Sequence, residues 1–194
     1  MTSSIYGAHY PDMQRAMQDV VQRIQELRTA MTAQYGMDPV EHCLCRIKAE
    51  DSMREKCRRQ GLPETEDSAL RCITDAIGIR IVCAFLDDVY RVAEYLKSFR
   101  DLTVVKEKDY IRHVKDNGYR SYHMILTTAD GYYVEIQLRT ISMDTWAALE
   151  HHMRYKKDVR ANADLIAAEL KRCADELAST DVSMQAIRDL IYNS

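Results

Sequence analysis

The stretch SYHMILTTADGYYVEIQLRT, residues 121–140, decides the fold of this chain. Alternating apolar and polar residues flank Asp130 and Gly131, a pair that favours the tight turn of a hairpin. Because side chains alternate along a strand, the second half has one apolar face and one polar face. The apolar face holds Val134, Ile136 and Leu138, and the polar face holds Glu135, Gln137 and Arg139. The stretch therefore predicts a β-hairpin with one face in the core.

The rest of the chain supplies more strands and several helices around this hairpin. Residues 11–35 predict a helix, because Pro11 suits a first turn, Gly36 suits an end, and apolar residues recur at helical spacing. Further strands are expected at 42–48, 78–85 and 102–108, and further helices at about 51–60, 66–73, 87–99, 141–156 and 160–192, the last two ranges forming three helices. This order predicts an α/β (α+β) fold, a mixed sheet flanked by helices.

Charged side chains recur at alternate positions on three of the predicted strands. Arg46 and Lys48 share one face of their strand, and Arg80 lies on one face of the next. If these strands neighbour the hairpin, one sheet face collects these cations with Glu135, and Asp75 lies at its rim. Such a face is either a solvent-exposed surface of paired charges or a cleft whose two acids hold a divalent cation. The cleft would suit phosphates, because Arg and Lys neutralise their charge.

Length, composition and charge limit the class of protein. The chain has 194 residues, 46% hydrophobic and 29% charged, which excludes a disordered chain. Its net charge of −3 does not indicate RNA binding. No apolar run could span a bilayer and the N-terminus lacks a signal-peptide pattern, so a cytoplasmic protein without membrane contact is predicted. The six cysteines are expected to be buried thiols, because the pair Cys43 and Cys45 is a weak zinc signal.

Five ordered blocks of sequence resemble RelA/SpoT-type alarmone synthetases. They are RIKAEDSMREK (46–56), DAIGIRIVC (75–83), KDYIRHVKDNGYRSYH (108–123), VEIQLRT (134–140) and MDTWAALEHHMRYK (143–156). The chain has no room for the hydrolase and regulatory domains of the long members, so it is similar to the small alarmone synthetases of the RelQ type, with a nucleotidyltransferase-like fold. The implied organisation is one structural domain with an N-terminal helix (1–40), a synthetase core (41–157) and C-terminal helices (158–194).

The resemblance implies a GTP pyrophosphokinase of the stringent response. Such an enzyme transfers pyrophosphate from ATP to the 3′-hydroxyl of GDP or GTP and releases AMP. The implied cofactor is Mg²⁺, bound by the catalytic residues Asp75 and Glu135, and Glu135 would also activate the 3′-hydroxyl. The implied ATP-binding residues are Arg46, Lys48, Ser52, Lys56 and Arg80, with the two arginines on either side of adenine. The implied GDP/GTP-binding residues are Tyr119, Lys115, His123, Gln137 and Arg139, with Tyr119 stacked on guanine.

The chain departs from the family pattern at two places. Ala49-Glu50 replaces a Ser-Pro pair, and His113-Val114 replaces an Asn-Pro pair in the loop implied to bind the acceptor. The second change leaves the preference between GDP and GTP open. Small members form homotetramers, partly through terminal helices, and some bind an alarmone between subunits. The resemblance therefore implies a homo-oligomer and an allosteric alarmone site.

Other interpretations stay open from the sequence. One is a toxin-like relative that pyrophosphorylates adenine nucleotides or the 3′ end of tRNA, although the acidic residues of 164–194 argue against RNA binding. Another is a nucleotide- or RNA-binding regulator with a degenerate site, although the presence of both Asp75 and Glu135 argues for an enzyme. Taken alone, Tyr119 is a surface tyrosine, His123 has a structural role, and Trp146 packs helices together.

Overall fold

The computed structural model describes residues 4–155 and 162–192. Its helices and strands, in chain order, are η1 (Gly7–His9), α1 (Tyr10–Tyr35), β1 (Val40–Ile47), α2 (Glu50–Arg59), η2 (Ser68–Cys72), β2 (Ile77–Cys83), α3 (Leu86–Lys97), β3 (Leu102–Asp109), β4 (Tyr122–Thr128), β5 (Tyr133–Thr140), α4 (Ile141–Tyr155) and α5 (Ala163–Tyr192). The predicted order of helices and strands through residue 140 is confirmed.

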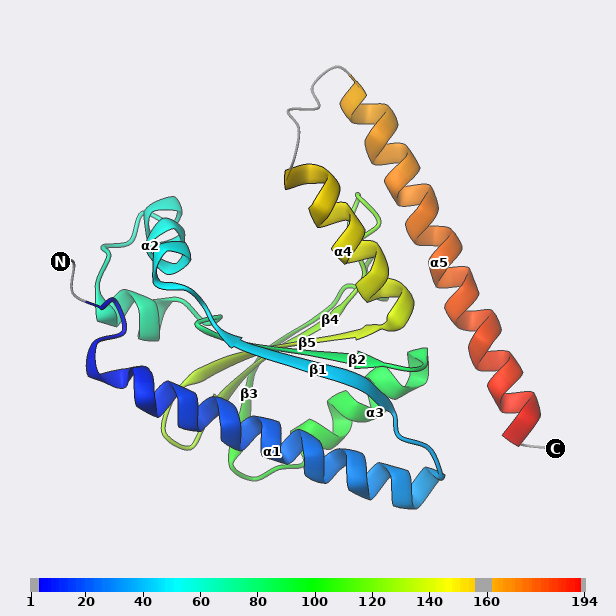
Figure 1. Ribbon diagram of the computed structural model, residues 1–194, viewed down its shortest axis with the longest axis horizontal. Helices are drawn as coiled ribbons and strands as arrows, with labels where there is room; N and C mark the ends of the chain where they lie inside the picture. The colour runs from blue at the N-terminus through cyan, green and yellow to red at the C-terminus, as the bar shows by residue number, and fades with distance from the viewer. Residues whose placement is uncertain (1–3, 156–161, 193–194) are drawn as a thin grey trace.

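The strands form one mixed sheet in the order β1-β2-β5-β4-β3. The β2–β5 pair is parallel and the other three pairs are antiparallel. Helices α1 and α3 cover one face of the sheet, whereas α2 and α4 lie over opposite ends of the other face (Figure 1). The predicted mixed sheet flanked by helices is confirmed, and the helices that the structure describes leave the second face open between α2 and α4.

Strands β4 and β5 form the hairpin predicted for residues 121–140. Its turn places Gly131 at a φ of +80°, a conformation that glycine adopts readily, and the Gly131 N–H donates to the Thr128 carbonyl over 2.9 Å. Strand β5 lies between β4 and β2, at the centre of the sheet. The polar side chains of β5 therefore lie at the centre of the open face of the sheet.

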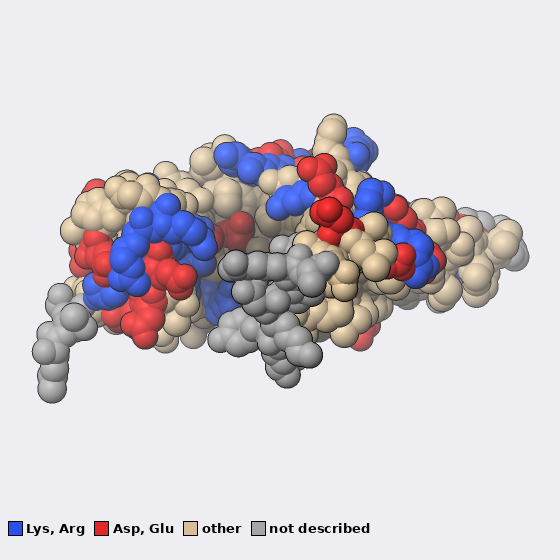
Figure 2. Space-filling view, turned by 90° about the horizontal axis from the view of Figure 1, so that it is seen from above, with Lys and Arg blue, Asp and Glu red and all other residues tan. Residues whose placement is uncertain are grey.

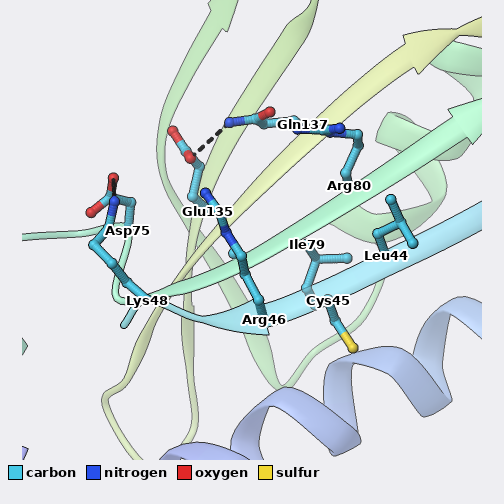
Figure 3. Close-up of a pocket in the computed structure, with 10 residues that line it drawn as sticks. Leu44, Cys45, Arg46, Lys48, Asp75, Ile79, Arg80, Glu135 and Gln137 are labelled. Carbon is cyan, nitrogen blue, oxygen red and sulfur yellow. Dashed lines mark hydrogen bonds and ion pairs between the residues drawn. The ribbon is translucent and has the colours of Figure 1, made fainter. Parts of the chain in front are cut away.

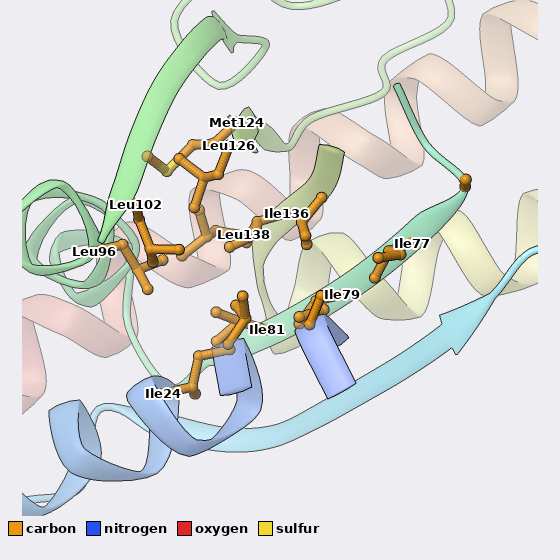
Figure 4. Packing of buried hydrophobic residues seen from close by; sticks show 14 of the residues in the cluster. Ile24, Ile77, Ile79, Ile81, Leu96, Leu102, Met124, Leu126, Ile136 and Leu138 are labelled. Carbon is orange, nitrogen blue, oxygen red and sulfur yellow. The ribbon is translucent and has the colours of Figure 1, made fainter. Parts of the chain in front are cut away.

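The core lies between the sheet and the two helices α1 and α3. Apolar side chains of β2, β4 and β5, including Ile79, Ile81, Ile136 and Leu138, meet Ile24 of α1 and Leu96 of α3 (Figure 4). Ile136 and Leu138 are fully buried. Each such side chain stabilises the fold by roughly 1.5–3 kcal/mol, and a slip of one residue would expose the whole apolar row of β5. The core thus fixes which side chains face the open side.

Two expectations from the sequence are wrong. Residues 163–192 form one helix, α5, and not two, because no Gly or Pro interrupts them. Cys57 and Cys83 are buried, but Cys45, Cys72 and Cys173 are exposed. Cys45 lies on β1, which is an edge strand of the sheet formed by residues 4–155 and 162–192. The expected boundary between residues 157 and 158 lies outside the described residues.

Helix α5 is attached to the sheet and to α4 by buried polar contacts. The Thr140 hydroxyl donates to the Asp181 carboxylate over 2.5 Å, at the end of β5. Trp146 of α4 is 5% exposed and its indole N–H donates to the Leu170 carbonyl over 2.8 Å, so this residue packs the two helices as predicted. These contacts hold α5 beside the end of the sheet that carries Arg139.

Among the described helices, none combines the length and the apolar content needed to cross a membrane.

Candidate active site

The strand order brings the predicted polar positions side by side. Arg80 of β2 pairs with Gln137 of β5, and Gly78 pairs with both Glu135 and Arg46. Glycine at that position leaves room above the sheet between the two longer side chains. A cavity of about 260 Å³ opens there, and its lining includes Arg46, Lys48, Asp75, Arg80, Glu135 and Gln137 (Figure 3). The predicted convergence of the two acids on one sheet face is confirmed.

Asp75 lies just before β2 with two lysines around its carboxylate. Its Oδ2 is 3.0 Å from Lys48 Nζ and 2.5 Å from Lys56 Nζ, and its side chain is only 17% exposed. Burial acts to raise the pKa of Asp75, but the two ammonium groups outweigh burial and hold this pKa below its usual range. The other oxygen, Oδ1, is buried and has no hydrogen-bond partner among the described residues.

Glu135 lies on β5 between polar neighbours. Gln137 Nε2 donates to Glu135 Oε2 over 3.0 Å, and His123 Nδ1 lies 3.5 Å from Oε1. Burial acts to raise the pKa of Glu135, as does the nearby charge of Asp75, but the contacts with His123 and Gln137 outweigh them and lower this pKa. Both acids are therefore ionised at neutral pH.

A closed ring of contacts joins Glu135 to Tyr119. Arg139 Nη2 donates to Gln137 Oε1 over 3.2 Å and to the Tyr119 hydroxyl over 2.9 Å. That hydroxyl lies 2.9 Å from His123 Nε2, which completes the ring back to Glu135. The Tyr119 ring also lies 4.9 Å from Lys115 Nζ and 5.3 Å from Arg139 Cζ, measured to the ring centroid. The structure thus brings Tyr119 and His123 together with Glu135 in one network of contacts.

A second basic cavity opens on the other side of Glu135. Its volume is about 300 Å³, and its lining includes Thr74, Lys106, Lys108, Tyr110, Lys115, His123 and Glu135. Lys115 Nζ lies 4.4 Å from the Tyr110 ring centroid, a cation–π distance. Glu135 lines both cavities, so this one carboxylate stands where they meet.

The charges on the open face surround a hollow. Figure 2 looks onto this face and shows basic and acidic atoms together on both sides of the hollow between α2 and α4 and in the part of it that is visible. A cleft with low-dielectric walls focuses the field of the cations that line it more than a flat surface would. This arrangement favours the cleft over a flat surface of paired charges.

Sequence reasoning missed several residues of this site. Asp144, in the first turn of α4, accepts from Arg139 Nη1 over 2.9 Å and lies 3.3 Å from Arg80 Nη1. Asp144 lies five residues after Arg139. Because α4 begins directly after β5, the sequence could have indicated that the first turn of the helix lies close to Arg139. Lys106 was missed because β3 is irregular there, so alternation does not place its side chain. Ser52 is exposed on α2 and lies outside the lining of both cavities.

A five-stranded mixed sheet with helices on both faces and two acids on its open face is the architecture of nucleotidyltransferase-like proteins. Residues 45–160 match the family described as "Region found in RelA / SpoT proteins". The GTP pyrophosphokinase YwaC of Bacillus subtilis (strain 168) is 40% identical over 161 residues, which cover 79% of this chain and 76% of that protein. The chain belongs to the RelA/SpoT family.

Two crystal structures of a Bacillus subtilis protein carry nucleotides on the same fold. Small alarmone synthetase 1 bound to its product pppGpp is 32% identical, with a TM-score of 0.80 over 94% of this chain and 95% of that one. The same synthetase bound to AMPCPP is 28% identical, with a TM-score of 0.72 over 94% of each chain. The nucleotidyltransferase-like fold is thus confirmed along almost the whole chain.

Proposed function

We propose that this protein is a small alarmone synthetase, a GTP pyrophosphokinase that transfers pyrophosphate from ATP to the 3′-hydroxyl of GDP or GTP and releases AMP. The observation that carries the proposal is the position of Glu135, which lines two basic cavities at once. A transfer between two nucleotides needs two such cavities and one reactive group between them. The names of the similar proteins, GTP pyrophosphokinase and small alarmone synthetase, support the same activity.

The cavity beside Asp75 is the proposed ATP site. Arg46 is exposed and Arg80 is half-buried on the neighbouring strand, so both guanidinium groups can lie against the faces of adenine. Lys48 and Lys56 both contact the Asp75 carboxylate, and from there their ammonium groups can bind the phosphate oxygens of ATP. The exposed Ser52 stays a proposed phosphate contact at the start of α2, which the bound nucleotide would have to reach beyond the cavity.

The cavity beside His123 is the proposed GDP/GTP site. Lys115 and His123 supply cationic and hydrogen-bonding groups for the acceptor phosphates, with Lys106 and Lys108 beside them. Tyr119 is the proposed stacking residue for guanine. Lys115 and Arg139 lie over its ring in this structure, so stacking requires one of these cations to give way. Gln137 and Arg139 hold Glu135 and Tyr119 in place.

The two acids fit Mg²⁺. This ion prefers oxygen ligands and is commonly held by one or two carboxylates together with phosphate oxygens. Asp75 and Glu135 are ionised at neutral pH, and the buried Oδ1 of Asp75 has no partner in the described part of the chain. We propose that these two carboxylates hold the ion. Bound Mg²⁺ would supply Lewis-acid polarisation of the donor phosphates.

The chemistry proposed for the chain's own groups is proton transfer, positioning and charge neutralisation. The 3′-oxygen of the acceptor forms a bond to the β-phosphorus of ATP, and the bond from that phosphorus to the α–β bridging oxygen breaks. Glu135 accepts the hydroxyl proton, and the electron pair of the broken bond leaves on AMP. Lysines and arginines hold the phosphates, because charge and geometry limit phosphoryl transfer.

An acceptor screen tests the proposal. Purified protein with ATP, Mg²⁺ and GDP or GTP should yield AMP and a guanosine 3′-diphosphate. Glu135→Gln should keep nucleotide binding and lower kcat by about 10²–10⁴-fold, the range for loss of a general base. Failure of the folded wild type with both acceptors would reject the proposal. Products on adenine nucleotides or tRNA alone would indicate the toxin-like relative, and binding without turnover would indicate a regulator.

Assembly and location also belong to this proposal. Large apolar side chains are exposed along the last two helices, namely Leu149 and Met153 of α4 and Leu165, Val182, Met184, Ile187 and Ile191 of α5. Exposed apolar rows of this kind mark protein interfaces, which supports the predicted homotetramer. A cytoplasmic location, where ATP and guanine nucleotides are available, and an alarmone bound between subunits stay predictions. Light scattering of the purified protein tests the assembly.

A further inference from the structure

The residues before α1 are held firmly against the rest of the fold. Ile5 is 2% exposed and Tyr6 is fully buried. At the end of this segment His9 Nδ1 lies 2.8 Å from the Tyr132 hydroxyl, and His9 Nε2 lies 3.3 Å from Glu66 Oε1. We call residues 4–9 the N-terminal bracket, because contacts with distant parts of the chain hold it at both ends.

The bracket contacts the turn between β1 and α2 at two points. The Tyr6 hydroxyl donates to the Lys48 carbonyl over 2.6 Å. The Ser4 hydroxyl and the Ile5 N–H donate to the two carboxylate oxygens of Glu50 over 2.6 and 3.2 Å. Glu50 stands where the family pattern has a proline, which offers no carboxylate. We call residues 48–52 the donor turn, because they include Lys48 and Ser52.

These contacts determine where the Lys48 main chain lies. Its N–H donates to the Ala76 carbonyl over 2.8 Å, so it is tied to the residue that follows Asp75. Its carbonyl is tied to Tyr6, and its Nζ lies 3.0 Å from Asp75 Oδ2. Burial raises the pKa of the Tyr6 hydroxyl far above neutrality, and the charges of Asp75 and Glu50 add to this effect. Tyr6 therefore remains a hydrogen-bond donor throughout the working pH range.

We propose that the N-terminal bracket positions the donor turn, with Tyr6 and Glu50 as positioning residues that set the affinity for ATP. This inference rests on the proposed function, because the donor turn carries two of the proposed ATP contacts. Neither residue lines the cavity beside His123. Loss of the bracket contacts should therefore weaken the binding of ATP and leave the binding of GDP or GTP unchanged.

Tyr6→Phe and Glu50→Ala test the proposal in the full chain. Tyr6→Phe removes one hydroxyl and leaves the Lys48 carbonyl without that bond, which should raise KM for ATP about tenfold and leave KM for GDP or GTP within about twofold. Glu50→Ala should act in the same direction. Glu55→Ala is the matched control: it removes an exposed carboxylate from α2, outside the donor turn, and it should leave both KM values unchanged.

Ser4→Ala shows whether the effect passes through the bracket. Ser4 is exposed, so the variant should fold. Its effect should shrink in the Glu50→Ala background, because both changes remove the Ser4–Glu50 bond and only the longer contact from the Tyr6 N–H to the Ser4 hydroxyl, at 3.3 Å, is left for Ser4→Ala to remove. Titration with the α,β-methylene analogue of ATP measures donor affinity without turnover. Equal increases in KM for donor and acceptor would overturn the proposal, as would unchanged analogue affinity in both Tyr6→Phe and Glu50→Ala.

The same measurements separate this inference from the proposed function. A wild type that neither binds the analogue nor turns over with any guanine nucleotide overturns the proposed function and this inference with it. A wild type that is active, with variants indistinguishable from it, overturns the inference alone. A donor-specific loss in the active protein supports both.

Discussion

Gly118 lies at the contact between α5 and the loop that carries Tyr119. Its φ is +90°, in the left-handed region that favours glycine. A Cβ added there would lie 2.7 Å from the Ala174 Cβ and 3.1 Å from the Lys171 Cα, both of them fixed on α5. The next residues are Tyr119 and Arg120, and Arg120 Nη2 pairs with Asp175 of α5 over 2.7 Å. Gly118→Ala should therefore push the loop away from the helix.

The magnitude follows from two costs. The left-handed backbone costs an alanine about 1–2 kcal/mol, and overpacking against a fixed helix costs about 1–3 kcal/mol. If the fold absorbs the change, stability falls by about 2–5 kcal/mol. If the loop yields, Tyr119 moves with it, and kcat/KM for GDP or GTP falls at least tenfold at about 1.4 kcal/mol per decade. KM for ATP should change little, because Gly118 does not line the donor cavity.

Urea unfolding and steady-state kinetics of Gly118→Ala measure both outcomes. Gly36→Ala is the control: Gly36 has a φ of +75°, but no described atom beyond its chain neighbours lies within 4 Å of the added Cβ. It carries the backbone cost without the clash. The double variant Gly118→Ala/Ala174→Gly should relieve the clash with the Ala174 Cβ, while the backbone cost and the contact with the Lys171 Cα remain and the added helix glycine costs about 1 kcal/mol. Equal stability losses in Gly118→Ala and Gly36→Ala, with unchanged acceptor kinetics, would refute the reasoning.

Three further changes probe other parts of the protein. Tyr119→Ala should weaken the binding of GDP or GTP by about 1–3 kcal/mol if the ring stacks on guanine, and Tyr119→Phe should weaken this binding less. If titrations show that ATP binding is weakened by the same amount as GDP or GTP binding, Tyr119 does not stack on guanine. Asp144→Asn should lower the free energy of unfolding by about 3 kcal/mol, because the buried Arg139 loses its anionic partner, and a loss below about 1 kcal/mol in urea unfolding would contradict this. Burial, and then the neighbouring Asp87, raises the pKa of Asp88 from 3.8 to about 6, so its ionisation destabilises the fold as pH rises through this window. The free energy of unfolding of Asp88→Asn, relative to that of wild type, should therefore increase by about 2 kcal/mol between pH 4.5 and pH 7.5. If urea unfolding gives the same difference between the two proteins at both pH values, the effect is excluded.

The open face of the sheet could be predicted because strands have a period of two. Glu135 and Gln137 alternate with buried residues on β5, and Arg80 does so on β2, so their common face follows once the strands are neighbours. That neighbour relation was an assumption, and the parallel pairing of β2 with β5 confirms it. The position of Asp75 at the rim followed from its place just before β2.

Contacts that depend on distant segments could not be predicted. Tyr6 meets Lys48 across 42 residues, and Arg120 meets Asp175 across 55, and no local pattern reports either pair. Glu50 shows how this limits interpretation: in the sequence it is a departure from the family, and in the fold it accepts two hydrogen bonds. The cysteines were misjudged for a related reason, because the burial of Cys45 or Cys173 depends on what packs beside it and not on residue type.

The two acids of the candidate site differ in their surroundings, and this difference supports the roles proposed for them. Asp75 faces two ammonium groups, so its charge is already balanced before a nucleotide arrives. Glu135 has no lysine or arginine nitrogen within ion-pair distance among the described residues, and its partners are His123 and Gln137. A permanent cation beside a carboxylate weakens it as a base, whereas an amide does so far less. Glu135 is therefore better suited to accept a proton. Asp75 is better suited to gather cations around the donor phosphates, and the lysines that now neutralise it are the groups that a bound triphosphate would draw away.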